Sequence, residues 1–333
     1  MTAAVLAIDG GNSKTDVVLI AADGHLLAHV RGPGSSPHKL GGSGCFTLLE
    51  QLVAQARSEA DVEAGVDADP AAGVADVAAV YLAGADLPRE IVDLQSRLSQ
   101  LGWAPKAYVE NDTFALLRTG TDSPDAVAVV CGAGINCVGV RADGEQVRFP
   151  ALGRSSGDWG GGWQLGEEAL WAAARDEDGR GEPTVLTARV AAWFGLVSAA
   201  AVGEAMHFDD LSGERLVELA PLVLQASVEG DPVARALVDR LVDEITLLAV
   251  AALRRLDLLG RAADIVLGGG VIAAQDPVLL PGIRAQLAAA APLAVPRVVD
   301  DPPVLGAGLA GLDLLSAPPD AYRRLRASGL ASR

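Results

Sequence analysis

The residues best placed to do chemistry lie near the start of the chain, in a polar segment between apolar runs at 3–8 and 17–20. Two glycines let this segment turn its backbone N–H groups inward, and its side chains add two hydroxyls and an ammonium, a combination typical of an anion nest for the phosphates of a nucleotide. The spacing matches neither the Walker loop nor the Rossmann fingerprint, and a glycine hairpin with solvated polar side chains is the alternative. The segment reads Asp9-Gly10-Gly11-Asn12-Ser13-Lys14-Thr15-Asp16.

The same order of features returns in the second third of the chain. An apolar run at 126–130 leads into a small-residue turn at 131–136, and residues 137–140 are again apolar. Both copies then contain Ala-Asp-Gly, at 22–24 and 142–144, before another strand-like run. Each copy predicts a three-strand meander, so the repeat favours two similar lobes that grip one phosphate chain from both sides. Chance repetition of Ala-Asp-Gly in an alanine-rich chain is the competing interpretation.

A second candidate for chemistry is Asp112, which stands between a predicted strand at 107–110 and a helical segment at 114–118. Catalytic groups of open α/β folds lie beyond the carboxyl ends of strands, so Asp112 is the candidate general base. The alternative role for Asp112 is the N-cap of the helix, for which aspartate is a preferred residue.

Two glycine-rich segments further along suit ligand contacts. Segment 153–163 is too polar and glycine-rich for a core element, and its Asp158 can accept several hydrogen bonds from a ligand with hydroxyls; a mobile surface loop is the alternative. Gly268-Gly269-Gly270 ends a predicted strand, where it either lets a nucleoside lie against the backbone or forms a tight turn. The Rossmann-like match at 306–311 has too little chain after it for a dinucleotide unit, so its glycines predict close helix packing.

Composition limits the class of protein. The chain of 333 residues is 50% hydrophobic and 21% charged, enough for two domains with full cores. Its formal net charge of −17 argues against binding to nucleic acid or to anionic membranes. No apolar run is long enough to span a membrane and no basic region precedes the first one, so a cytoplasmic location is expected. The cysteines, Cys45, Cys131 and Cys137, have no metal-site or disulfide spacing and are expected to be buried.

The remaining pattern alternates helices and strands, which predicts α/β lobes. The N-terminal lobe is expected to comprise residues 1–115, with the first phosphate turn and Asp112. The C-terminal lobe is expected to comprise residues 116–333, with the second turn and both glycine-rich segments, its last helix packing back on the N-terminal lobe. The predicted helices are 46–63, 88–101, 165–174, 184–194, 216–228, 232–259 and one from 277, the further strands are 77–82 and 263–267, and a linker is expected at 64–75.

Five of these segments, in order, resemble motifs of the BadF/BadG/BcrA/BcrD ATPase family of the actin, sugar kinase and Hsp70 superfamily, above all its N-acetylglucosamine kinase branch. The resemblance extends over about residues 4–311 and implies an α/β, two-lobed actin-like ATPase (ribonuclease H-like) fold with a central nucleotide and sugar cleft. It also implies ATP with Mg²⁺, and transfer of the γ-phosphoryl group to the 6-hydroxyl of N-acetylglucosamine. The five segments are 9–16, 110–112, 132–137, 157–161 and 268–271.

The resemblance also implies roles for particular residues. Asp112 would accept the proton of the sugar hydroxyl, and Asp9 would hold Mg²⁺ through water. The nucleotide would be bound by Asp9, Gly10, Gly11, Asn12, Ser13, Lys14, Thr15, Gly132, Ala133, Gly134, Gly268, Gly269 and Gly270. The sugar would be bound by Ser36, His38, Asn111, Asn136, Gly157 and Asp158.

Differences from the family pattern leave the sugar open. Trp159 stands where the family has an acid after Asp158, and residues 34–38 lack the asparagine and tryptophan of animal N-acetylglucosamine kinases. Glucosamine and N-acetylmuramate are therefore alternative substrates. The expected partner is a small-molecule amino sugar, with no nucleic acid and no membrane, and a homodimer is allowed.

The competing function is the family's other branch, the ATPase activators of 2-hydroxyacyl-CoA dehydratases and benzoyl-CoA reductases. Such activators need cysteines on a shared dimer surface to hold an iron–sulfur cluster. The cysteines here bracket the second turn or begin a helix, which supplies no plausible ligand set. A non-catalytic sugar sensor ranks last, because the sequence shows neither a basic surface nor a DNA-binding appendage.

Overall fold

The computed structural model describes residues 3–64 and 73–330 of the chain. Most of the expected linker at 64–75 therefore lies outside the described residues. Within the described part, no helix is both long enough and apolar enough to cross a membrane.

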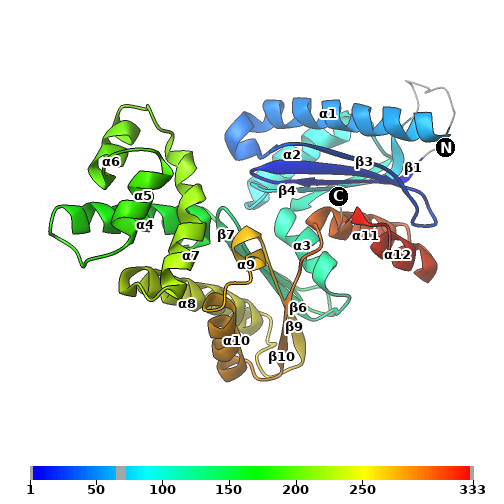
Figure 1. Cartoon of the computed structure of the whole chain (residues 1–333). Helices are drawn as coiled ribbons and strands as arrows, with labels where there is room; N and C mark the ends of the chain where they lie inside the picture. Colours follow the sequence, from blue (N-terminus) through cyan, green and yellow to red (C-terminus); the bar gives the residue numbers. More distant parts are fainter. Residues whose placement is uncertain (1–2, 65–72, 331–333) are drawn as a thin grey trace. The chain divides into compact units, whose positions relative to one another are not determined.

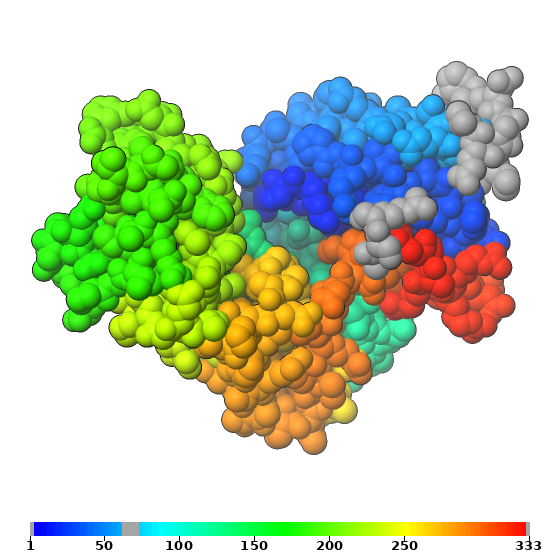
Figure 2. Space-filling model, viewed as in Figure 1, coloured from blue at the N-terminus to red at the C-terminus, as the bar shows by residue number. Residues whose placement is uncertain are grey.

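The chain divides into two compact units. Unit 1 consists of Met1–Asp122 and Val299–Arg333, and unit 2 consists of Ser123–Val298. Residues from both ends of the chain thus share unit 1, where Figure 2 shows red C-terminal residues beside blue N-terminal ones. This grouping differs from the expected lobes at residues 116–122, where helix α3 continues, and at residues 299–333, where helix α11 (Pro303–Leu314) packs on strand β1 (Ala3–Gly10) of unit 1.

Unit 1 is built on a five-stranded sheet in the order β3-β2-β1-β4-β5. The first three strands form the predicted antiparallel meander, and β4 and β5 continue the sheet parallel to β1. The parallel strands end together, so their carboxyl ends form one edge of the sheet. The strands are β1, β2 (Lys14–Ile20), β3 (Leu26–Pro33), β4 (Ala75–Leu82) and β5 (Lys106–Asn111).

Helices cover both faces of this sheet (Figure 1). Successive side chains of a strand point to opposite faces, so Leu6 and Ile8 pack toward one helical layer while Val5 and Ala7 pack toward the other. This arrangement explains why the first strand is a continuous apolar run rather than an alternating one. One layer holds α1 (Pro37–Ala64) and α2 (Pro88–Gln100), and the other holds α3 (Asp112–Gly120), α11 and α12 (Pro319–Arg326).

The glycines of α11 confirm the predicted close packing. A Cβ added to Gly306 would lie 1.9 Å from the carbonyl oxygen of Ala115 in α3. A Cβ on Gly311 would lie 2.2 Å from a side-chain carbon of Val5 in β1. Both distances are below contact distance, so only glycine lets α11 lie this close to α3 and to the sheet.

Unit 2 repeats the plan of unit 1. Its sheet has the order β10-β9-β6-β7-β8, in which β6, β7 and β8 form the second meander and β9 and β10 run parallel to β6. The duplication inferred from the sequence is therefore confirmed at the level of sheet topology. The strands are β6 (Ala126–Cys131), β7 (Ile135–Val140), β8 (Gln146–Arg148), β9 (Ala263–Gly268) and β10 (Ala294–Val298).

The helices of unit 2 surround an apolar core that includes Leu165, Leu241 and Ile245. Among the α-helices and strands of the described residues, α6 (Ala199–His207), α9 (Gly270–Ala273), α12 and β10 were not predicted. Helix α6 is alanine-rich with little periodicity, and α12 is mostly charged and buries only Ala321 and Leu325, so neither has a strong apolar stripe. The helices are α4 (Gly161–Glu177), α5 (Leu186–Trp193), α6 (Ala199–His207), α7 (Ala220–Val228), α8 (Pro232–Arg255), α9 (Gly270–Ala273) and α10 (Leu279–Ala290).

Candidate active site

The first predicted phosphate turn is the hairpin that joins β1 to β2. The Gly11 N–H donates to the Lys14 carbonyl at 2.9 Å, and the side chains of Asn12, Ser13 and Lys14 are exposed at the tip. Thr15 differs from them, because its side chain is buried and its hydroxyl donates to a carbonyl of β3 at 2.8 Å. The hairpin therefore offers one hydroxyl and one ammonium to a ligand at its tip.

The segment after β3 lies against this hairpin. A Cβ on Gly34 would lie 2.4 Å from the Asn12 carbonyl oxygen, and a Cβ on Gly10 would lie 2.5 Å from the Ser35 hydroxyl. The hydroxyls of Ser35 and Ser36 are buried and have no hydrogen-bond partner among the residues that the structure describes. Buried hydroxyls are normally satisfied, so both are candidates for contact with a ligand or water. Ser36 was predicted as a sugar contact, whereas Ser35 was missed although it is adjacent.

Two acids stand at the carboxyl edge of the sheet in unit 1. Asp9 lies near the end of β1 and is 6% exposed, and Asp112 is the first residue of α3, directly after β5. Burial, then the charges of Asp112 and Asp16, raise the pKa of Asp9 well above its usual value, against the opposing charge of Lys14. Burial also raises the pKa of Asp112 to about 6, although backbone N–H groups at the start of α3 oppose this shift.

The N-cap of α3 is Asn111 rather than Asp112. Asn111 has extended backbone angles, and its side-chain oxygen accepts a hydrogen bond from the Thr113 N–H at 2.9 Å. The capping alternative for Asp112 is thus wrong, because a helix has one N-cap and the neighbouring asparagine fills it. The Asp112 carboxylate is left for another role.

A hydrogen-bond chain connects Asn111 with His38 at the start of α1. The Asn111 amide donates to Asp86 Oδ1 at 2.8 Å, and Glu90 Oε2 accepts from the Asp86 N–H at 3.1 Å. Glu90 Oε1 in turn accepts from the His38 ring at 2.8 Å. Both His38 and Asn111 were predicted as sugar contacts, and the structure brings them into one network. Asp86 and Glu90 were missed, because no local sequence signal reveals which distant side chains they contact.

Lys14 is held at the hairpin by a buried acid on its own strand. Its ammonium lies 3.5 Å from Asp16 Oδ2, and Asp16 also accepts hydrogen bonds from His29 at 2.9 Å and from Arg31 at 2.7 Å. Burial disfavours the charge of Asp16, but these hydrogen bonds prevail and lower its pKa to about 2. Asp16 therefore binds three side chains of the meander, those of Lys14, His29 and Arg31.

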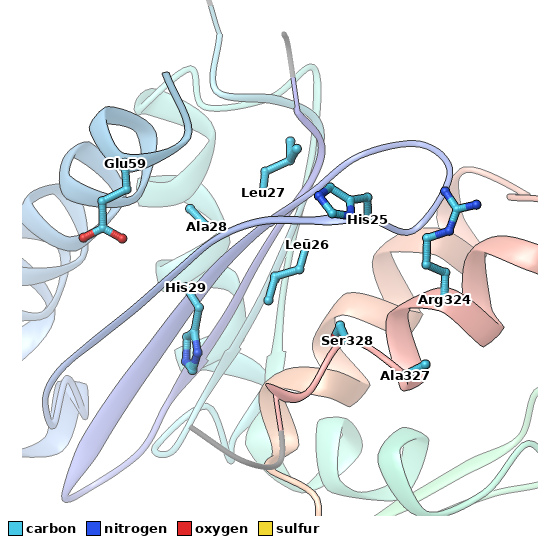
Figure 3. Close-up of a pocket in the computed structure, with 9 residues that line it drawn as sticks. All are labelled: His25, Leu26, Leu27, Ala28, His29, Glu59, Arg324, Ala327 and Ser328. Atoms are coloured by element: carbon cyan, nitrogen blue, oxygen red, sulfur yellow. The ribbon is translucent and has the colours of Figure 1, made fainter. Parts of the chain in front are cut away.

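His29 also lines a cavity at the edge strand β3, away from the hairpin tip (Figure 3). The cavity has a volume of about 450 Å³ and extends between β3, α1 and the end of α12. None of the residues predicted to bind nucleotide or sugar lines it. Its lining is His25, Leu26, Leu27, Ala28, His29, Glu59, Arg324, Ala327 and Ser328.

In unit 2, three glycine segments converge at one edge of the sheet. The second predicted turn, between β6 and β7, accepts hydrogen bonds from the first turn of α4, where Gly162 N–H donates to the Gly132 carbonyl at 2.8 Å. A Cβ on Gly161 would lie 2.5 Å from the Gly134 Cα, and one on Gly269 would lie 2.5 Å from the carbonyl of Cys131. Segment 268–270, which was predicted to flank the adenosine, lies beside the second turn because β9 pairs with β6.

Three predicted sugar contacts belong to unit 2, namely Asn136, Gly157 and Asp158. Asn136 is 9% exposed on β7, and its side-chain oxygen accepts from the Cys137 N–H at 2.7 Å. Asp158 is half-buried and accepts from the Ser156 hydroxyl, and Gly157 beside it has a positive φ of 85°. Segment 153–163 was expected to be too polar and glycine-rich for a core element. This is wrong at Trp159, which is 4% exposed and belongs to the apolar core of unit 2.

All three cysteines are fully buried, as expected. Burial raises the pKa of the Cys45 thiol to about 11 and that of Cys131 to about 12, and it raises the pKa of Cys137 as well. None presents a thiolate to solvent, and each is a small core side chain.

Each unit has an antiparallel meander continued by parallel strands, with glycine turns at strand ends and, in unit 1, a carboxylate there. This duplicated plan is the fold of the actin-like ATPases and sugar kinases. The chain belongs to the BadF/BadG/BcrA/BcrD ATPase family, whose model matches residues 6–309. Membership in this family implies the use of ATP.

Individual relatives extend this assignment. The chain is similar to the N-acetylmuramic acid/N-acetylglucosamine kinase of Clostridium acetobutylicum, with 25% identity over 269 residues, 80% of this chain and 85% of that protein. It is also similar to the N-acetyl-D-glucosamine kinase of Dictyostelium discoideum, with 23% identity over 232 residues, 69% of this chain and 72% of that protein. A solved structure from Chromobacterium violaceum, assigned as an N-acetylglucosamine kinase, shares the fold with a TM-score of 0.72 and 24% identity, covering 93% of this chain and 99% of that chain.

Proposed function

We propose that this protein is an ATP-dependent amino-sugar kinase that converts N-acetylglucosamine and ATP into N-acetylglucosamine 6-phosphate and ADP. Family membership supports the use of ATP, and both curated relatives are named for N-acetylglucosamine. The observation that carries the proposal is the position of Asp112. This residue begins α3 without serving as its N-cap, and its pKa is about 6. Its charge also raises the pKa of Asp9.

Asp112 is the proposed general base. The 6-hydroxyl oxygen of the sugar attacks the γ-phosphorus of ATP, the bond from that phosphorus to the β,γ-bridging oxygen breaks, and the hydroxyl proton passes to the Asp112 carboxylate. A base is most effective when its pKa lies near the working pH, and a raised pKa of about 6 meets that condition. General-base catalysis contributes roughly 10²- to 10⁴-fold to such a rate.

The acids of the site also fit a divalent cation. Asp9 and Asp112 are carboxylates whose negative charges repel one another. Mg²⁺ prefers hard oxygen ligands such as these. In the proposal Asp9 holds Mg²⁺ through water, and the ion would neutralise charge on the transferred phosphoryl group.

The other contacts follow from what each side chain still offers. Ser13 and Lys14 at the hairpin tip would contact phosphates, whereas Thr15 is left out because its hydroxyl is already donated. In unit 2, the turn 132–134 would contact phosphates and the segment 268–270 would adjoin the adenosine. The proposed sugar contacts are Ser36, His38, Asn111, Asn136, Gly157 and Asp158.

A coupled assay of ADP release tests the proposal, with N-acetylglucosamine, glucosamine and N-acetylmuramate as acceptors. We expect N-acetylglucosamine to give the highest kcat/KM and ATP turnover without acceptor to be slow, because the acceptor completes the site and excludes water. Asp112→Asn should lower kcat by at least on the order of 10²-fold. ATP hydrolysis that is indifferent to every amino sugar would overturn the kinase assignment.

A further inference from the structure

The side chain of Asn111 is held from both ends. Its oxygen accepts from the Thr113 N–H at 2.9 Å, and its amide nitrogen donates to Asp86 Oδ1 at 2.8 Å. An amide flipped by 180° would face the Asp86 carboxylate with its oxygen and the Thr113 N–H with its own N–H groups. Both contacts would then be repulsive, so the Asp86 carboxylate and the Thr113 N–H together determine which way the cap points.

The orientation of this cap matters because the next residue is Asp112. The Asn111 oxygen satisfies an N–H of the first turn of α3, and the Asp112 carboxylate interacts with the N–H groups of Asp112 and Thr113 in the same turn. A loosened cap would let this turn fray, which moves the carboxylate and weakens its contacts with those N–H groups.

Asp86 is itself held in place from the second helix. Its N–H and that of Leu87 donate to Glu90 Oε2, at 3.1 and 2.8 Å, at the start of α2. The His38 ring donates to the other oxygen of Glu90 and packs against Gly84, where an added Cβ would lie 3.2 Å from the ring. The side-chain nitrogen or oxygen atoms of His38, Asp86 and Glu90 that could bind a metal lie within 4.8 Å of one another. Each residue is already hydrogen-bonded, His38 as donor and the two carboxylates as acceptors, so we interpret them as a hydrogen-bond chain.

We propose that Asp86 is a positioning residue for Asp112: by orienting the Asn111 cap it holds the first turn of α3, and through Glu90 it ties that turn to His38. The inference rests on the proposed function, in which Asp112 is the base and His38 lies near the sugar. A sugar bound at His38 would thereby stabilise the first turn of α3, which holds Asp112. Asp86 touches neither substrate nor the reacting atoms in this scheme.

The test compares Asp86→Ala with Asp86→Asn and with Asp93→Ala, which removes an exposed acid from the same helix region. Asp86→Ala should lower kcat about 10- to 100-fold while the KM for ATP stays within about twofold, since misplacement of a catalytic group acts on the chemical step. Asp86→Asn should recover most of kcat, because the asparagine oxygen still accepts from Asn111. Asp93→Ala should behave as the wild type.

The pH profile separates positioning from mere stability. Loss of the N–H contacts in Asp86→Ala should shift the acid limb of kcat to higher pH, whereas Asp86→Asn should not show this upward shift. Where Asp86→Ala does not fold, Asp86→Glu keeps the charge but misplaces the acceptor, and it should show the same loss of kcat at a Tm close to that of the wild type.

Two results would overturn the inference. One is Asp86→Ala, or the folded Asp86→Glu, with the kcat and pH profile of Asp93→Ala. The other is Asp86→Asn that falls as far as Asp86→Ala at equal Tm, which would mean that charge and not orientation matters. Because Asp112→Asn is measured in parallel, the two proposals fail separately: an active Asp112→Asn contradicts the proposed base, whereas an inactive Asp112→Asn beside an active Asp86→Ala contradicts only the positioning role.

Discussion

The carboxylates of Asp9 and Asp112 influence one another across the strand ends of unit 1. After burial, the charge of Asp112 is the strongest influence that raises the pKa of Asp9. The two residues are far apart in the chain but share an edge, because β4 pairs in parallel with both β1 and β5 and brings Gly10, Leu82 and Asn111 into register. Two acids that cannot both ionise easily are suited to a base and a cation ligand.

The raised pKa of Asp112 predicts the pH dependence of turnover. The base must be deprotonated to accept the hydroxyl proton, so kcat with N-acetylglucosamine should fall as the pH drops through about 6. The measurement is kcat at saturating ATP and sugar between about pH 5 and pH 8. A kcat that stays constant across this range would argue against Asp112 as the base.

The same pKa predicts that Asp112→Asn is more stable than the wild type at neutral pH. The pKa is about 6 in the folded state and 3.8 in the reference state, so the folded protein holds this proton more tightly and is destabilised above about pH 6. Removing the buried charge should raise the free energy of unfolding at pH 7 by on the order of 1–3 kcal/mol, a gain that vanishes near pH 4. Urea unfolding at both pH values measures it, and equal differences at the two would contradict the explanation.

Asp16 should be a major source of stability in unit 1. Asp16→Ala leaves His29, Arg31 and Lys14 without their common acceptor. The Arg31 and Lys14 side chains are half-exposed and can turn to water, so the expected loss is about 1.5–3 kcal/mol, the contribution of hydrogen bonds to a charged group. Because the pKa of Asp16 is lowered to about 2, its contribution is present above about pH 4 and is lost as the pH falls toward 2. Chemical denaturation checks this, with the exposed Asp76→Asn as control, and a similar loss in both variants would refute it.

Gly161 and Gly157 form a matched pair that isolates the packing of the second turn. Both have positive φ, 84° and 85°, but a Cβ on Gly161 would lie 2.5 Å from the Gly134 Cα, whereas a Cβ on Gly157 meets nothing within 4 Å. Gly157→Ala should cost about 1–2 kcal/mol from backbone strain alone. Gly161→Ala should lose about 1–3 kcal/mol more and raise the KM for ATP as the turn shifts. Equal losses of unfolding free energy would show that the contact is not rigid.

The cysteines distinguish the kinase from the activator branch. Because Cys45, Cys131 and Cys137 are all buried, replacing each with alanine should leave kinase turnover intact and lower stability modestly. The purified protein should be colourless and should keep its activity in air. A brown protein whose ATPase activity is lost in air, and lost again in the cysteine variants, would favour the iron–sulfur activator.

Much of the fold is encoded locally. Continuous apolar runs broken by glycine turns predicted both meanders, because a strand buried on two faces needs apolar residues throughout and a tight turn needs residues that tolerate its backbone angles. The positions of Asp9, Asp112 and the glycine turns at strand ends followed from the same pattern. The repeat of that pattern also indicates the duplicated topology.

Only the tertiary structure decided which residues meet. The cap of α3 is Asn111, whose amide also donates to Asp86, a residue from another loop. Ser35 is buried because segment 34–36 packs against the first hairpin. The C-terminal helices join unit 1 because the glycines of α11 allow its backbone to approach β1 and α3. Local sequence encodes backbone angles and apolar periodicity, whereas hydrogen-bond partners and close contacts depend on elements that only the folded sheet brings together.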